Sequence, residues 1–134
     1  MKTKRLNIAI IGLGTIGSYL FNYLKLNKFQ LVKKNGIEPI ISHVSAKIKN
    51  KKRNIKLGKI KWLNNYLDAT KIKEIDIIIE LIGGSEGPAK RLVFSALKNK
   101  KHVVTANKAL ISKYGDELSL IAEKNKVNLE FEAA

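Results

Sequence analysis

The sequence contains no cysteine and only two prolines among its 134 residues. The absence of cysteine excludes disulfides, thiolate metal sites and cysteine nucleophiles, and it agrees with a reducing compartment. No apolar run approaches the roughly 18 residues that a membrane-spanning helix needs. The basic N-terminus is followed by a glycine-rich turn rather than by the core of a signal peptide. We therefore expect a cytoplasmic protein with no membrane partner.

Acidic residues are also scarce, with 11 Asp and Glu against 26 Lys and Arg, which gives a formal net charge of +15. Such an excess favours polyanionic partners, but lysines occur in nearly every segment and mainly predict a solvated basic surface. Aromatic residues make up only 7% of the chain. Platforms for stacking bases are therefore not evident, and no specific nucleic-acid partner is expected.

The chain has the length of one domain, and we predict a single domain over residues 1–134. Short aliphatic runs predict strands at 6–11, 39–44, 60–63, 75–82, 102–105 and 127–131. Apolar residues at helical spacing predict three helices. The first begins at Ile16, the second follows a Ser85 N-cap and has Pro88 in its first turn, and the third lies around Leu118. This alternation predicts a Rossmann-type, doubly wound α/β fold, with a mostly parallel sheet and helices on both faces.

Residues 12–17 read GLGTIG, a G-x-G-x-x-G pattern between the first predicted strand and the first predicted helix. Gly12 would permit the tight turn, Gly14 the approach of a pyrophosphate, and Gly17 close packing of the helix on the strand. The N–H groups near Thr15 and Ile16 would face the anion, aided by the helix dipole. A glycine-rich turn without a ligand is the alternative, but the position between strand and helix favours a dinucleotide site.

The end of the second predicted strand discriminates between the two nicotinamide dinucleotides. An NAD site usually has an Asp or Glu there for the ribose 2′-hydroxyl, and the nearest acid, Glu38, lies at the other end of the strand. The strand instead leads into a basic cluster that runs from Lys47 to Arg53. We therefore predict NADP as the cofactor, with NAD as the alternative. A solvated basic loop without a ligand is the other interpretation.

Three stretches, in this order, resemble the homoserine dehydrogenase family: GLGTIG at 12–17, ELIGG at 80–84 and HVVTANKALI at 102–111. The ending LEFEAA at 129–134 fits as well. The third stretch is the specific one, since very many dehydrogenases share the first. The resemblance implies the cofactor-binding domain of an oxidoreductase that interconverts aspartate 4-semialdehyde and homoserine with NAD(P)H, in the biosynthesis of threonine, methionine and isoleucine.

The resemblance also implies the residues of the site. Those expected to bind the cofactor are Gly12, Leu13, Gly14, Thr15, Ile16, Gly17, Lys47, Gly83, Gly84, Thr105 and Lys108. Lys108 is the candidate catalytic residue, because an ammonium near a carbonyl oxygen stabilises developing negative charge; a surface lysine after an Asn107 N-cap is the alternative. The alternative for Gly83 and Gly84 is that they form only a turn after a strand and have no role in cofactor binding. Glu132 is expected to offer its backbone oxygen to a monovalent cation, at a site only partly present.

Family members continue beyond the position of Ala134 into a domain that binds substrate and dimerises. We therefore expect this truncated chain to bind NADP(H) with little or no activity, and to meet aspartate semialdehyde or homoserine only with that further domain. We also expect a monomer or weak dimer with apolar surface exposed near Phe131. A stand-alone, non-catalytic NADP-binding or regulatory module and a nucleic-acid-binding protein are the alternative functions. Glu80 is predicted to be a buried, hydrogen-bonded carboxylate, and His43 and His102 to be structural.

Overall fold

The computed structural model describes residues 4–131. Its elements are β1 (Lys4–Ile11), α1 (Thr15–Leu26), α2 (Lys28–Asn35), β2 (Ile37–Ser45), β3 (Lys61–Trp62), the 3-10 helix η1 (Tyr66–Thr70), β4 (Ile77–Glu80), α3 (Pro88–Lys98), β5 (His102–Thr105), α4 (Lys108–Lys124) and β6 (Leu129–Phe131). The strands form one sheet in the order β3-β2-β1-β4-β5-β6, and every neighbouring pair is parallel. This is the predicted doubly wound arrangement, with β1 at its centre.

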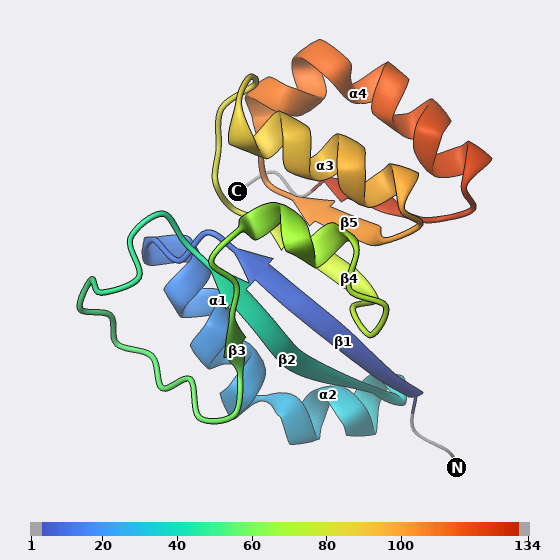
Figure 1. Ribbon diagram of the computed structural model, residues 1–134. Coiled ribbons are helices and arrows are strands. Elements are labelled where there is room, and N and C mark those ends of the chain that lie inside the picture. The colour runs from blue at the N-terminus through green and yellow to red at the C-terminus, as the bar shows by residue number, and fades with distance from the viewer. Residues whose placement is uncertain (1–3, 132–134) are drawn as a thin grey trace.

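Alternate residues of the central strand face opposite sides of the sheet. In β1, Ile8 and Ile10 belong to the core that includes Phe21 of α1, whereas Ala9 and Ile11 belong to the core beneath α3 and α4. Figure 1 shows α1 and α2 on one side of the sheet, and η1, α3 and α4 on the other. Because both faces of β1 are covered over its buried half, residues 8–11 are a continuous aliphatic run rather than an alternating one.

The structure corrects two details of the prediction and adds a third. Gly87 is the N-cap residue of α3 and no side chain caps that helix, so the expected Ser85 cap is wrong, whereas Pro88 does lie in the first turn. The helix after the glycine-rich turn is broken at Asn27 into α1 and α2. Strand β4 is shorter than predicted, because the chain turns after Glu80 and the Glu80 carboxylate accepts the N–H of Ile82.

Edge strand β6 leaves the Phe131 side chain 36% exposed, as expected. No helix within residues 4–131 has both the length and the apolar content needed to cross a membrane.

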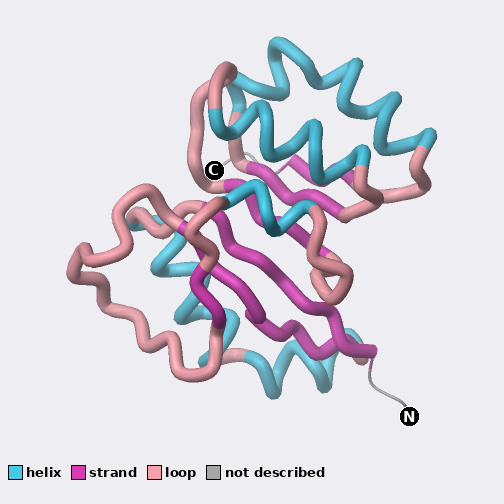
Figure 2. The backbone as a smooth tube through the Cα atoms, viewed as in Figure 1, coloured by secondary structure: helices cyan, strands magenta, loops and turns pink. Residues whose placement is uncertain are grey.

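Residues 46–60, here called the basic loop, connect β2 to β3 without a helix (Figure 2). Four of its apolar residues pack on the core beside α1: Ala46, Ile55, Leu57 and Ile60. Two side chains of α1 also hold it, since Asn22 donates to the Asn54 carbonyl at 2.8 Å and Lys25 to the Lys56 carbonyl at 3.2 Å. The loop therefore covers the face of β2 that a second crossover helix would otherwise cover.

His43 in β2 makes the stability of the domain depend on pH. Its side chain is only 7% exposed, and this burial, with a smaller contribution from the charge of Lys61, lowers the pKa of His43 below its ordinary value of about 6.5. The unfolded chain therefore takes up a proton near pH 6.5, whereas the folded chain does so only at lower pH. Stability should fall as the pH drops from about 7 through the pKa of the folded state.

We expect His43→Gln to flatten that decline, because glutamine does not titrate. The measurement is the free energy of unfolding in urea at pH 7.5, 6.5 and 5.5 for both proteins. An identical pH slope in the variant would show that other groups cause the decline.

Candidate functional site

Four strands end at the same level of the sheet. Ile11 at the end of β1 pairs with Ser45 of β2 on one side and with Glu80 of β4 on the other, and Glu80 pairs in turn with Thr105 of β5. The residues that follow these strands therefore meet at one edge. In open parallel sheets, ligands bind at this carboxyl edge, where the order of the strands reverses.

The glycine-rich turn fits closely against the loop that follows β4. Gly12 has a φ of +111°, and a Cβ there would lie 2.6 Å from the carbonyl carbon and oxygen of Leu81. A Cβ on Gly17 would collide with the carbonyl oxygen of Gly12, so helix α1 approaches the turn as only glycine allows. Gly14 is different, because a Cβ built on it meets nothing within 4 Å. The turn is thus packed at its first and third glycines and open at its second.

The open glycine is also the start of helix α1. Gly14 is the N-cap residue, no side chain caps the helix, and the first turn contains no acidic residue. The N–H groups of this turn and the positive end of the helix dipole therefore have no competing anion from their own helix. This end of α1 has the features of a phosphate-binding site.

Glu80 links the loops that follow β4 and β5. Its side chain is only 1% exposed. One carboxylate oxygen accepts the N–H groups of Ile82 and Gly83 at 2.8 and 2.9 Å, and the other accepts the hydroxyl of Thr105 at 2.6 Å. The predicted buried carboxylate is confirmed, and the structure adds what it does: it shapes one loop and ties it to the next strand.

Asn107 completes this connection. Its backbone N–H donates to the Thr105 hydroxyl oxygen at 3.0 Å, and its side-chain amide donates to the Gly84 carbonyl at 2.7 Å. Its side-chain oxygen accepts the N–H of Leu110 and caps α4, the cap that the alternative interpretation of Lys108 included. The role of Asn107 as a bridge to the glycine pair could not be predicted, because the bridge joins positions 23 residues apart.

A small pocket of about 150 Å³ lies where the three loops meet. It is lined by Ile16, Glu80, Leu81, Ile82, Gly83, Ala106 and Asn107. The structure therefore brings together the first turn of α1, the residues after β4 and the residues after β5. Of the expected cofactor-binding residues, only Ile16 and Gly83 line this pocket, while Thr105 is buried beneath it and holds Asn107.

Comparison with known proteins matches residues 12–132 to the family model described as homoserine dehydrogenase, NAD binding domain. The chain belongs to the homoserine dehydrogenase NAD-binding domain family. It is 37% identical to homoserine dehydrogenase of Neisseria gonorrhoeae and 36% identical to that of Bacillus subtilis, in each case over 98% of this chain and 30% of the relative. The 134 residues thus span about a third of the length of these relatives.

Solved structures agree with this assignment. Homoserine dehydrogenase of S. aureus matches 98% of this chain and 33% of its own chain, with a TM-score of 0.88 and 37% identity. The enzyme from Thiobacillus denitrificans matches 96% of this chain and 30% of its own, with a TM-score of 0.88 and 36% identity. The chain is therefore a domain that binds a nicotinamide dinucleotide, and the carboxyl edge of its sheet is the candidate site.

The remaining predicted residues of this homoserine dehydrogenase domain do not line the pocket. Lys108 is exposed at the first position of α4, directly after Asn107. Gly84 has a φ of +85° and offers its carbonyl to Asn107. Lys47 is exposed two residues beyond β2. Glu132 lies outside the described residues, and residues 4–131 contain no cluster of three acidic or histidine side chains suited to a metal ion.

Glu86 and Tyr114 hold the entry to α3 against α4. The Tyr114 hydroxyl donates to the Glu86 carboxylate at 2.6 Å, and this hydrogen bond is the main cause that lowers the pKa of Glu86. Lys90 and Lys113 lie within 3.6 Å and 3.4 Å of the same carboxylate. The loop between β4 and α3 is thus held at Gly84 by Asn107 and at Glu86 by Tyr114.

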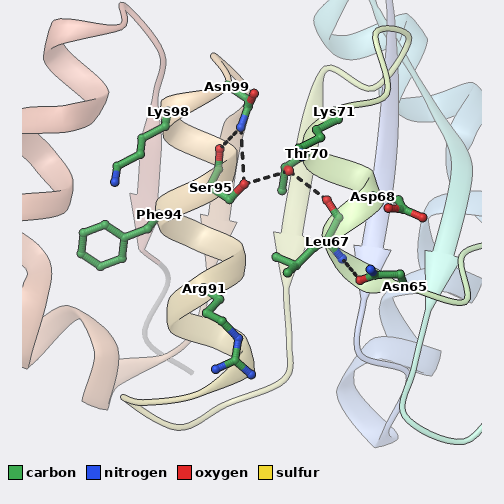
Figure 3. Close-up of a pocket in the computed structure, with 10 residues that line it drawn as sticks. All are labelled: Asn65, Leu67, Asp68, Thr70, Lys71, Arg91, Phe94, Ser95, Lys98 and Asn99. Carbon is green, nitrogen blue, oxygen red and sulfur yellow. Dashed lines mark hydrogen bonds between the residues drawn. The ribbon is translucent and has the colours of Figure 1, made fainter.

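A larger groove, of about 470 Å³, lies away from this edge, between η1 and α3 (Figure 3). A chain of hydrogen bonds crosses it, from Ser95 to the Thr70 hydroxyl at 2.9 Å and from Thr70 to the Leu67 carbonyl at 2.8 Å. It contains none of the expected site residues. Volume alone would therefore select a different place from the carboxyl edge of the sheet.

Proposed function

We propose that this domain binds NADP(H) and presents it for the homoserine dehydrogenase reaction, the interconversion of aspartate 4-semialdehyde and homoserine. The observation that carries the proposal is the glycine-rich turn, which is closed at Gly12 and Gly17 and open at Gly14, at the uncapped start of α1. A pyrophosphate can approach the backbone only where no side chain intervenes. The bound nucleotide would supply or accept the hydride.

NADP is favoured over NAD by the residues at the end of β2. Within residues 4–131, no carboxylate lies within ion-pair distance of Lys47. The strand's own acid, Glu38, lies at its opposite end, where it pairs with Arg5 at 3.2 Å. A 2′-phosphate at this edge would therefore meet a cation and no opposing charge. We expect Lys47 to be its main side-chain partner.

On the nicotinamide side, we propose that Gly83 and Gly84 allow close approach of the ribose, and that Lys108 faces the carbonyl oxygen of the substrate. An ammonium at that position would stabilise negative charge as the hydride is transferred. Activity is proposed for a protein that also contains the part of the family that binds substrate, since these residues correspond to about 30% of each relative. The proposal assigns no step to the monovalent cation.

A calorimetric titration with NADPH and, separately, NADH at physiological salt tests this proposal. We expect one-to-one binding with preference for NADPH. Lys47→Asp should weaken NADPH binding about 10- to 100-fold, because a charge-assisted hydrogen bond contributes roughly 1.5–3 kcal/mol. Binding of NADH should change much less. Absence of binding by the wild-type chain would contradict the proposed function, and equal losses for both nucleotides would contradict the role of Lys47.

A further inference from the structure

The charged residues of the basic loop are not equivalent. Its four lysines between positions 47 and 52 are exposed, whereas Arg53 is half-buried. The Arg53 guanidinium points into the loop and donates to three of the loop's own carbonyls, those of Ile48, Lys49 and Lys51, at 2.5, 3.2 and 3.3 Å.

The same side chain reaches the glycine-rich turn. Arg53 Nε donates to the Leu13 carbonyl at 3.2 Å, and the guanidinium carbon lies 5.5 Å from the centre of the Trp62 ring. Arginine is suited to this position, because its planar group carries five donors in a fixed fork and stacks on aromatic rings. One side chain therefore joins the loop, the turn and strand β3.

The two halves of the basic loop are held by different contacts. The second half is held by α1, through the carbonyls of Asn54 and Lys56. The first half contains neither helix nor strand. Among the side-chain hydrogen bonds of residues 4–131, those to the carbonyls of this half come from Arg53. Lys47 lies between the end of β2 at Ser45 and Ile48, whose carbonyl Arg53 binds, so Arg53 constrains the chain on the C-terminal side of Lys47.

We propose that Arg53 is a positioning residue that determines specificity for NADPH. It holds the segment that carries Lys47 at a fixed place relative to the glycine-rich turn, and its guanidinium is engaged with carbonyls rather than with the 2′-phosphate. This inference rests on the proposed NADP(H) function. It separates two roles within one basic cluster: Lys47 meets the phosphate and Arg53 keeps it in place.

Titrations of the 134-residue chain with NADPH and NADH test the inference through three variants. Arg53→Gln and Lys52→Gln each remove one positive charge from neighbouring positions, and Lys52 is exposed. Arg53→Lys keeps the positive charge but loses the planar guanidinium with its five N–H donors. We expect Arg53→Gln and Arg53→Lys to weaken NADPH binding at least about fivefold, with NADH binding changed less than about twofold. Lys52→Gln should change either affinity by less than about twofold.

A double-mutant cycle separates positioning from direct contact. If Arg53 acts through Lys47, adding Arg53→Gln to Lys47→Gln should weaken NADPH binding little further. Additive effects, together with near-normal NADPH binding by Arg53→Lys, would mean that Arg53 meets the phosphate itself and would overturn the proposal. Equal effects of Arg53→Gln and Lys52→Gln would also overturn it, because only net charge would then matter.

NMR relaxation of the nucleotide-free protein supplies a readout that does not require binding. The backbone order parameters of residues 46–53 should be lower in Arg53→Gln and Arg53→Lys than in the wild type or Lys52→Gln, because the carbonyls of this half of the loop lose their partner. Unchanged order parameters would overturn the inference while leaving the proposed function intact. Failure of the wild-type chain to bind either nucleotide would instead overturn the proposed function, and with it the role of Arg53 in specificity.

Discussion

Gly14→Asp should abolish binding of both NADH and NADPH and at the same time leave the fold intact or slightly more stable. Gly14 lies in ordinary extended backbone, with a φ of −74° and a ψ of −157°, and a Cβ there has open space around it. It is the N-cap residue of α1, a position where aspartate accepts backbone N–H groups and complements the helix dipole. The variant should therefore gain about 0.3–1 kcal/mol of stability.

The same carboxylate would occupy the place where the pyrophosphate approaches. Like charges brought together at an interface cost several kcal/mol, and each 1.4 kcal/mol is a factor of ten in affinity. We expect a loss of at least about 100-fold for either nucleotide, measured by calorimetric titration, with thermal unfolding recorded in parallel. The opposite signs of the two effects distinguish a lost site from a lost fold.

Asn128→Asp provides the matched control, because it makes the same change of charge at an exposed residue before β6, at the other end of the sheet. Its nucleotide affinities should stay within about twofold of the wild type. Retained binding in Gly14→Asp would show that the pyrophosphate does not approach this turn. A variant that fails to fold would show that Gly14 has a packing role that its open surroundings do not indicate.

Replacement of Glu80 is expected to give the largest loss of stability at the site. Glu80→Leu would leave two backbone N–H groups and the Thr105 hydroxyl without their acceptor; the hydroxyl is buried, whereas the two N–H groups are only partly buried. Each such loss costs about 1–3 kcal/mol, so we expect a total of about 3–5 kcal/mol from urea unfolding. Glu80→Gln should cost only about 1–3 kcal/mol, because its carbonyl oxygen can still accept the two N–H groups.

Thr105→Val tests whether Glu80 and Thr105 act as one unit. The variant removes the hydroxyl that joins the Glu80 carboxylate to the Asn107 N–H. In the double variant with Glu80→Gln, the loss of stability should be smaller than the sum of the two single losses, by at least about 0.5 kcal/mol. Strict additivity would mean that the loops after β4 and β5 are held independently.

Local sequence patterns predicted much of the fold. The aliphatic runs at 6–11 and 102–105 lie in β1 and β5, and the buried Glu80 and the parallel sheet are confirmed. Predictions failed where local signals compete. Ser85 is a better N-cap residue by type than Gly87, but Asn107 and Glu80 hold the loop around it in another path.

The sequence by itself determined the fold class, the glycine-rich turn and the family, because each depends on the spacing of neighbouring residues along the chain. Only the tertiary structure decided which residues support the site. Arg53 and Leu13 lie 40 positions apart, and Thr105 and Glu80 lie 25 positions apart. Such hydrogen bonds leave no periodic trace in a sequence, since they form only when the sheet brings the strand ends to one level. For the same reason, the sequence showed Arg53 only as the last residue of a basic cluster, whereas the fold turns its guanidinium towards backbone carbonyls.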